Sequence, residues 1–138
     1  MDELEISTDK SRIDIDMVHK FLSDSYWAKG RPRSIVEKSI NNSLCFSGFF
    51  NDKQVAFARV ITDQAVFGYI ADVFVLTDYR GRGFAKKIMN AILNYPDLRD
   101  LQLTLLATQD AHRLYEKFGF KRIPGSERAM SLFAMEGD

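Results

Sequence analysis

The sequence predicts an α/β fold with a central, twisted, mixed β-sheet of six or seven strands flanked by about four helices. Three observations support this prediction. Segments with strand and helix periodicity are mixed along the chain, which is typical of α/β and α+β proteins. Residues 66–76 are almost continuously apolar, as expected of a central strand covered on both faces. The chain has only 138 residues, and its three prolines are scattered singly, so we expect one domain spanning residues 1–138.

The first half of the chain is expected to form a strand, two helices and a hairpin. Apolar residues at helical spacing follow Asp14, a residue type favoured as a helix N-cap, and Pro32 suits the first turn of a second helix. Turn residues 51–53 separate two runs rich in aromatic and β-branched residues, which predicts the hairpin. The expected elements are a strand at 4–7, helices at 14–26 and 34–40, and strands at 44–50 and 54–61.

The second half is expected to alternate strands and helices after the central strand. A helical apolar face follows Gly81, and Gly119 occupies the usual position after the last helix. The final strand is expected at an edge of the sheet. The expected elements are strands at 66–76, 101–107 and 128–135 and helices at 81–94 and 111–118, with a further short strand at 120–123.

Composition excludes several classes of protein. Lys plus Arg and Asp plus Glu number 19 each, so the chain lacks the basic field of a nucleic-acid-binding protein. Cys45, His19 and His112 do not form a set at zinc-ligand spacing, so we expect no metal. No apolar run approaches the roughly 18 residues of a membrane span, and residues 1–5 are acidic, unlike a signal peptide. We therefore expect a cytoplasmic protein without a membrane partner.

A glycine-rich segment with four cations and no anion joins the central strand to the next helix. In Arg80-Gly81-Arg82-Gly83-Phe84-Ala85-Lys86-Lys87, the glycines would let an anion approach the unpaired amides at the helix start, so phosphate is the natural ligand. The alternative is a tight turn followed by a solvated basic helix face. Phe84 stands where a Walker loop needs Lys, and Lys86 stands where the Rossmann fingerprint needs its third glycine.

Two motifs are similar to those of the GNAT N-acetyltransferase superfamily. Arg80, Gly83 and Ala85 match the acyl-CoA-binding signature, Gln/Arg-x-x-Gly-x-Gly/Ala after a Val-rich strand. Residues 111–120 resemble the family's Ala-x-x-Leu-Tyr-x-x-x-Gly-Phe helix and follow in the family's order. One departure is Thr108, where the family often has Asn.

The resemblance covers about residues 54–120 as an acyl-CoA-binding core and is weak over residues 1–50, the divergent region where such proteins bind the acceptor. It implies a GNAT-like fold whose sheet is splayed in the middle. It also implies acetyl-CoA, or another short acyl-CoA, as co-substrate, without a metal. The residues that it implies for binding this co-substrate are Phe74, Val75, Leu76, Arg80, Gly81, Arg82, Gly83, Phe84, Ala85 and Lys86.

The implied reaction is direct attack of a primary amine on the thioester in a ternary complex. Tyr115 resembles the family's general acid, although its spacing alone also suits a core tyrosine. Asp72, the only charge in the central strand, is a candidate base or amine contact, with a structural ion pair to Arg59 as the alternative. Cys45 is expected to be buried, which disfavours a covalent acyl-enzyme.

The acceptor is left open between a small-molecule amine and a peptide or protein amine. Tyr26 and Trp27 are candidate substrate contacts, although Trp27 could instead close the core. Asp63 is a further candidate, with a turn residue as the alternative. A homodimer is compatible with this interpretation. The competing hypothesis is a non-catalytic acyl-CoA-binding or regulatory module.

Overall fold

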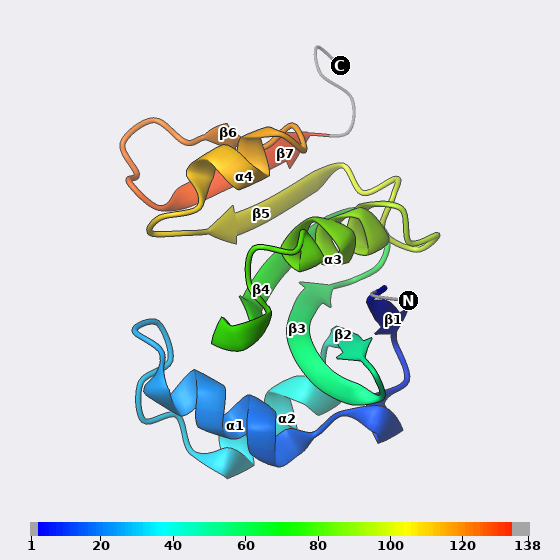
Figure 1. Ribbon diagram of the computed structural model, residues 1–138. Helices are drawn as coiled ribbons and strands as arrows, with labels where there is room; N and C mark the ends of the chain where they lie inside the picture. The colour runs from blue at the N-terminus through cyan, green and yellow to red at the C-terminus, as the bar shows by residue number, and fades with distance from the viewer. Residues whose placement is uncertain (1–2, 134–138) are drawn as a thin grey trace.

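A computed structural model describes residues 3–133 of the chain (Figure 1). Within these residues, one seven-stranded sheet has the order β1-β2-β3-β4-β5-β7-β6 and is accompanied by four α-helices and two short 3-10 helices. β4 and β5 are parallel, whereas every other neighbouring pair in the described sheet is antiparallel. The predicted mixed α/β fold is confirmed.

The bounds of the elements follow the predicted order. The strands are β1 (Glu5–Ser7), β2 (Leu44–Phe50), β3 (Lys53–Thr62), β4 (Phe67–Val75), β5 (Leu103–Ala107), β6 (Lys121–Arg122) and β7 (Ala129–Phe133). The helices are η1 (Lys10–Arg12), α1 (Ile15–Asp24), α2 (Arg33–Asn41), η2 (Thr77–Tyr79), α3 (Phe84–Leu93) and α4 (His112–Glu116). Residues 134 and 135, which the last predicted strand included, lie outside the described residues.

Two helices pack on each face of the sheet, over different parts of it. α3 and α4 lie on one face, where buried side chains of α3 such as Ile88 and Met89 pack on Val60 and Ile70. α1 and α2 pack against the β2–β4 half of the other face through Cys45, Phe57 and Phe74 (Figure 1). Two apolar clusters on opposite faces therefore hold the β2–β4 part of the sheet.

Three helices differ in length from their predicted spans for local reasons. α1 ends at Asp24 because Ser25 is extended, and its hydroxyl accepts a hydrogen bond from the Ala28 amide instead of continuing the helix. α3 begins at Phe84 because Gly81 and Gly83 adopt left-handed backbone conformations, each with φ of 79°. α4 spans only His112–Glu116 and is followed by a tight turn.

The start of α1 is fixed to the sheet by a buried amide. The Gln54 side chain accepts a hydrogen bond of 2.7 Å from the Asp14 amide and donates one of 3.2 Å to the Ala56 carbonyl. Asp14 in turn caps α1 by accepting from the Met17 amide at 3.1 Å, which confirms its predicted role. The orientation of α1 is thus set by β3.

β4 and β5 pair along only part of their length. The parallel pairing joins Phe67–Ile70 to Leu103–Leu106, and β4 then continues to Val75 without this neighbour. Asp72, with φ of 54°, lies at an irregularity in the β3–β4 register, which shifts between Phe57 and Arg59. Such a bulge bends a strand and increases its twist. The implied splay in the middle of the sheet is therefore present.

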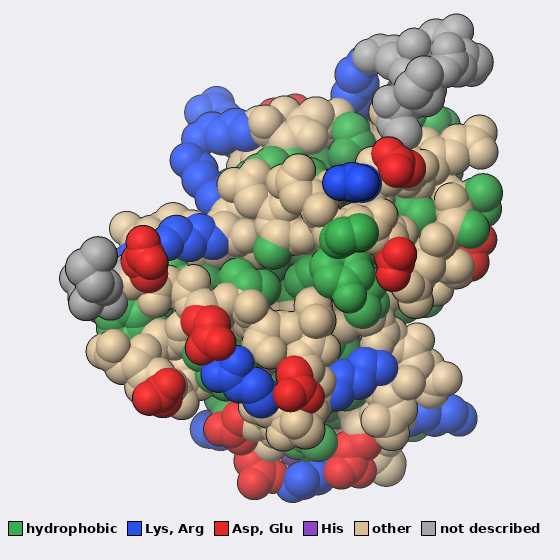
Figure 2. All heavy atoms as spheres, turned by 90° about the vertical axis from the view of Figure 1, so that its right-hand side faces the viewer, with side chains coloured by type: hydrophobic (Ala, Val, Ile, Leu, Met, Phe, Trp, Pro, Cys, Tyr) green, Lys and Arg blue, Asp and Glu red, His purple; other side chains and the backbone are tan. Residues whose placement is uncertain are grey.

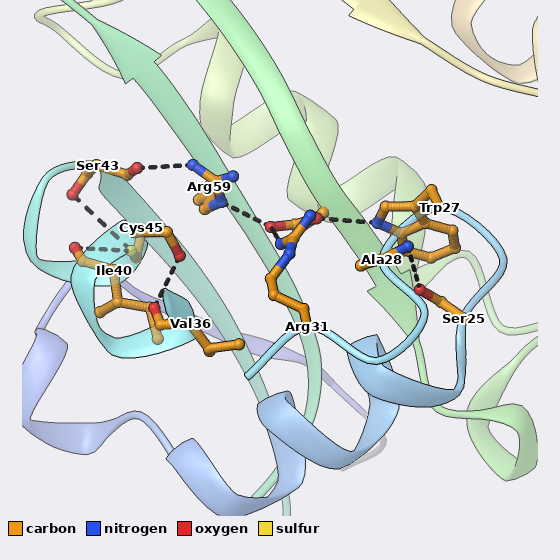
Figure 3. Close-up of polar contacts among 11 residues, drawn as sticks. Ser25, Trp27, Ala28, Arg31, Val36, Ile40, Ser43, Cys45 and Arg59 are labelled. Atoms are coloured by element: carbon orange, nitrogen blue, oxygen red, sulfur yellow. Dashed lines mark hydrogen bonds and ion pairs between the residues drawn. The ribbon is translucent and has the colours of Figure 1, made fainter. Parts of the chain in front are cut away.

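The Asp72 carboxylate joins this bulge to β3 and to the α1–α2 loop, residues 25–32. Its Oδ2 accepts hydrogen bonds from Arg59 Nε at 2.6 Å and Arg31 Nη1 at 2.8 Å, and its Oδ1 accepts from Trp27 Nε1 at 2.9 Å. Figure 3 shows Arg59 approaching from β3 and Arg31 and Trp27 from the loop. Because the Asp72 side chain is only 2% exposed, these donors replace its hydration.

The outer surface shows no comparable charge concentration on the face that Figure 2 displays. Acidic and basic side chains are interspersed there, in keeping with the equal totals of 19. Exposed ion pairs such as Arg12–Glu5 and Lys20–Asp24 contribute little to stability because water and salt screen them. Over residues 3–133 no helix is both long and apolar enough to span a membrane.

We predict that Asp72→Asn lowers the free energy of unfolding by about 3 kcal/mol, because it leaves two guanidiniums without their shared counter-charge. Urea denaturation measures the loss, and Asp24→Asn, which removes an exposed carboxylate, is the control with little expected effect.

The same variant also tests pH dependence. Burial raises the pKa of Asp72, but the hydrogen bond and charge of Arg59, the Trp27 hydrogen bond and the charge of Arg31 outweigh it and lower that pKa. The stabilisation is therefore complete above the unfolded pKa of about 3.9 and is lost as the pH falls below it. Equal acid sensitivity of the wild type and Asp72→Asn would contradict this assignment.

Candidate functional site

A cavity of about 1590 Å³ opens where β4 and β5 separate. Ligand pockets in proteins usually measure about 300–1,000 Å³, so this one has room for two molecules or one large one. Most of its wall comes from four parts of the chain. They are residues 69–76 of β4 and its end, the end of β5 with the connection to α4, the turn and first residues of α3, and α1 with its following loop. Arg59 of β3, Leu114 and Tyr115 of α4, and Arg128 complete the wall.

The turn before α3 forms one end of the cavity. Gly81 and Gly83 are both left-handed, and an added Cβ at either would meet no atom within 4 Å, so the backbone conformation alone calls for glycine. Gly83 caps α3 without a side-chain hydrogen bond, and the first intrahelical bond runs from the Lys87 amide to the Gly83 carbonyl. The three preceding amides of α3 are thus available to an anion.

Two cations line the cavity near these amides, and a third turns away. Arg80 and Lys86 line the cavity, and Arg80 Nε donates to the Val75 carbonyl at 3.0 Å, which fixes its direction. Arg82 does not line the cavity; its guanidinium lies over the rings of Phe50 and Tyr79, at 5.3 and 5.2 Å. The other nine residues implied for co-substrate binding do line it: Phe74, Val75, Leu76, Arg80, Gly81, Gly83, Phe84, Ala85 and Lys86.

The edge of β4 that faces the cavity offers a backbone donor. The Leu76 amide donates to Val55 of β3 at 2.8 Å, and alternate residues of a strand direct their N–H and C=O groups to opposite edges. The Val75 amide therefore points away from β3, toward the side on which β5 has departed. A ligand in extended conformation could pair with this edge as an added strand would.

Tyr115 belongs both to the core and to the cavity wall. Its side chain packs edge-on against Phe120, with ring centroids 6.2 Å apart, and the residue is 7% exposed. Burial, with smaller contributions from the charges of Asp110 and Tyr26, raises the pKa of Tyr115 to about 12. Its hydroxyl therefore keeps its proton at neutral pH and can act as a proton donor. The two interpretations of its spacing are compatible.

Asp72 also lines the cavity, and it makes the ion pair with Arg59 given above as the alternative interpretation. Both of its oxygens accept hydrogen bonds, and its pKa is lowered, so the carboxylate holds a proton weakly. These properties suit an anchor for Trp27 and the two arginines better than a general base.

Of the three substrate candidates, two line the cavity and one does not. Tyr26 and Trp27 line the cavity side by side, with ring centroids 5.2 Å apart, and are 53% and 40% exposed. Asp63 does not line it, which corrects its assignment as a substrate candidate. Its Oδ1 accepts from the amides of residues 65–67 and closes the β3–β4 turn.

Sequence reasoning missed Asp110 and Arg31 among the residues of the cavity wall. Asp110 directly precedes the helix motif that begins at Ala111, at a strand-to-helix connection where functional side chains are common. Arg31 lies in the same loop as Tyr26 and Trp27 but draws attention only once its ion pair with Asp72 is seen. Among the described residues, no group of three or more His, Cys, Asp or Glu could hold a metal.

Comparisons with known proteins agree with this geometry. Residues 41–122, more than half of the chain, match the family model described as an acetyltransferase (GNAT) domain. A Xanthomonas campestris pv. campestris protein whose crystal structure is described as belonging to the GNAT family is 49% identical. The match covers 90% of this chain and 88% of that one, with a TM-score of 0.87.

Two more distant relatives extend the comparison. A Gibberella zeae protein named as an acetyltransferase is 28% identical over 96% of this chain and 88% of its own length. A GNAT acetyltransferase of Elizabethkingia anophelis, solved with acetyl-CoA bound, is 10% identical and shares the fold, with a TM-score of 0.68 over 95% of this chain and 97% of that one. The family-model match, together with the splayed sheet and the turn before α3, shows that the chain belongs to the GNAT acetyltransferase family.

Proposed function

We propose that this protein transfers the acetyl group of acetyl-CoA to a primary amine by direct attack in a ternary complex. The observation that carries the proposal is that one cavity is lined both by the turn before α3, with its free amides, and by the Tyr115 side chain. The anion-binding turn before α3 lies at one end, and Tyr115 lies in the wall that the parting of β4 and β5 exposes.

The co-substrate is assigned to the β4 side of this cavity. Its pyrophosphate would contact the amides that begin α3, with Arg80 and Lys86 beside it. Its pantetheine arm would run along the free edge of β4. The Val75 amide, which points to that edge, is our candidate donor to the thioester oxygen, where an oriented donor is worth about 2.7–4 kcal/mol.

The reaction then needs protons to leave the nitrogen and to reach the sulfur. The acceptor ammonium loses a proton, its nitrogen attacks the thioester carbon, the nitrogen of the tetrahedral intermediate loses a second proton to water, and the carbon–sulfur bond breaks. Tyr115 donates its proton to the departing sulfur and regains one from solvent. The products are the amide, CoA with a free thiol and one proton.

We assign the first proton transfer to Asp110, directly or through water. It lines the same cavity as Tyr115, and after burial its charge contributes most to the raised pKa of this hydroxyl. Asp72 is the weaker candidate, because its oxygens already accept hydrogen bonds from three side chains.

The burial and the raised pKa of Cys45 disfavour a covalent acyl-enzyme. Cys45 belongs to β2, is 1% exposed, packs against the two N-terminal helices and does not line the cavity. Burial raises the pKa of this thiol to about 11, so very little of it is thiolate at neutral pH. These features support direct transfer.

The first test is thiol release from acetyl-CoA across a panel of primary amines, followed with a thiol reagent. We expect release that depends on both the amine and the protein, with the acetylated amine seen by mass spectrometry. A non-catalytic binding module would instead bind CoA in calorimetry and release no thiol above background, and this result would reject the proposal.

We predict that Tyr115→Phe lowers kcat by about 100-fold or more, because the leaving sulfur loses its proton donor. The Kd for CoA, measured by calorimetry, should stay within about twofold, since the ring remains. Tyr95→Phe is the matched control, because Tyr95 packs on Phe46 and does not line the cavity. An unchanged kcat in Tyr115→Phe would remove Tyr115 from the mechanism.

We predict that Gly83→Ala weakens CoA binding by about tenfold, because a Cβ disfavours the left-handed conformation by roughly 1–2 kcal/mol and the turn would rotate its amides. Gly125→Ala is the control: Gly125 has φ of 85°, no atom within 4 Å of an added Cβ and no place in the cavity wall. Both variants should lose similar stability in thermal melts. Equal Kd values for CoA would refute the binding role of the turn.

A further inference from the structure

The wall of the cavity opposite the anion-binding turn carries an excess positive charge. Two guanidiniums, those of Arg31 and Arg59, share the single carboxylate of Asp72. All three side chains line the cavity, and they are 21%, 12% and 2% exposed, so solvent compensates the second cation only in part. This set of three residues, the Arg31–Asp72–Arg59 cluster, has a formal charge of +1.

The described neighbours of the cluster do not supply a second anion. Arg59 Nη1 donates to the neutral hydroxyl of Ser43, and Trp27 is a neutral donor to Asp72. Of the acidic residues on the α1 side of the cavity, Asp16 pairs with Arg33 and Asp24 with Lys20. Asp14 caps α1.

Arg31 lines the cavity and retains unused hydrogen-bond donors. Among residues 3–133 its guanidinium bonds only to Asp72, through Nη1, and its remaining N–H groups have no protein acceptor. A guanidinium presents five N–H donors in a planar fork that matches a carboxylate. Figure 3 shows the Arg31 side chain extending from the α1–α2 loop to a position between Arg59 and Trp27.

We infer that the acceptor is a small amine that also carries a carboxylate, an amino acid in chemical class, and that Arg31 binds this carboxylate. The inference rests on the proposed function for the position of the amine, which would lie near Asp110 and Tyr115. Such an acceptor would meet an opposite charge at both ends. Its ammonium would lie near Asp110, and its carboxylate would bind the Arg31–Asp72–Arg59 cluster. Tyr26 and Trp27, both exposed beside Arg31, would contact its apolar part.

The test compares amino acids with matched compounds that lack the carboxylate. The panel contains the standard amino acids and their amides, phenethylamine as the decarboxylated form of phenylalanine, and β-alanine and 4-aminobutyrate, which lengthen the amine–carboxylate spacing. For the best amino acid, we expect kcat/KM to exceed that of its amide by about tenfold or more, because the amide lacks a charge-assisted hydrogen bond.

Two variants locate the effect. Arg31→Gln should bring the acid-to-amide ratio close to one, mainly through KM for the acid, and Arg31→Lys should leave an intermediate ratio. Arg33→Gln is the matched control, since Arg33 is exposed on α2, pairs with Asp16 and Glu37 and does not line the cavity. It should keep the wild-type ratio.

A binding measurement separates this inference from the proposed function. Melting temperatures of the wild-type protein with CoA should rise with the amino acid and not with its amide. If this shift occurs without thiol release, the carboxylate site stands and the proposed reaction fails. If amides and phenethylamine are acetylated as well as the acids, the reaction stands and the inference is overturned. An absence of both binding and turnover for every carboxylate-bearing amine also overturns it, as does an unchanged ratio in a folded Arg31→Gln.

Discussion

The arrangement of the site depends on the buried Asp72 carboxylate at the bulge in β4. A carboxylate that is 2% exposed must be paired, since leaving it without donors would cost several kcal/mol. The donors come from β3 and from the α1–α2 loop, which are otherwise separate walls of the cavity. One electrostatic requirement thus keeps β4 irregular where it leaves β5 and holds the loop that carries Tyr26, Trp27 and Arg31 against it.

The strands and helices were predictable because their determinants are local. Periodicity and turn residues place β2 at 44–50, as expected, and Asn51 and Asp52 take up the positive φ values that a tight hairpin needs. The bulge at Asp72 was not predictable. No residue type or spacing within 66–76 encodes a φ of 54° there; the conformation is favoured by partners 13, 41 and 45 positions away.

The residues of the candidate site likewise fall into those that a local motif predicts and those that depend on distant partners. The turn before α3 is one continuous segment, so its glycines and cations could be interpreted together, and Tyr115 follows from a motif of ten residues. Arg82 shows the limit of this reasoning, because its spacing matches its neighbours but the rings of Phe50 and Tyr79 attract its guanidinium elsewhere. Asp72 drew attention as a lone charge in an apolar strand. Whether such a charge acts as a base or as an anchor depends on donors from other elements, which only the fold brings together.

The overall neutrality of the chain conceals a consistent division of charge along the cavity. Arg80 and Lys86 lie at the α3 end, the charge of Asp110 acts on Tyr115, and the Arg31–Asp72–Arg59 cluster lies beside the α1–α2 loop. The proposed acyl transfer would benefit from this separation, because the anionic co-substrate and the ammonium group of an acceptor could each meet an opposite charge without pairing with each other. Equal totals of 19 acidic and 19 basic residues are therefore compatible with a polarised site. The exposed ion pairs account for part of the remaining balance, so the long-range field is weak and recognition depends on charges inside the cavity, where screening is least.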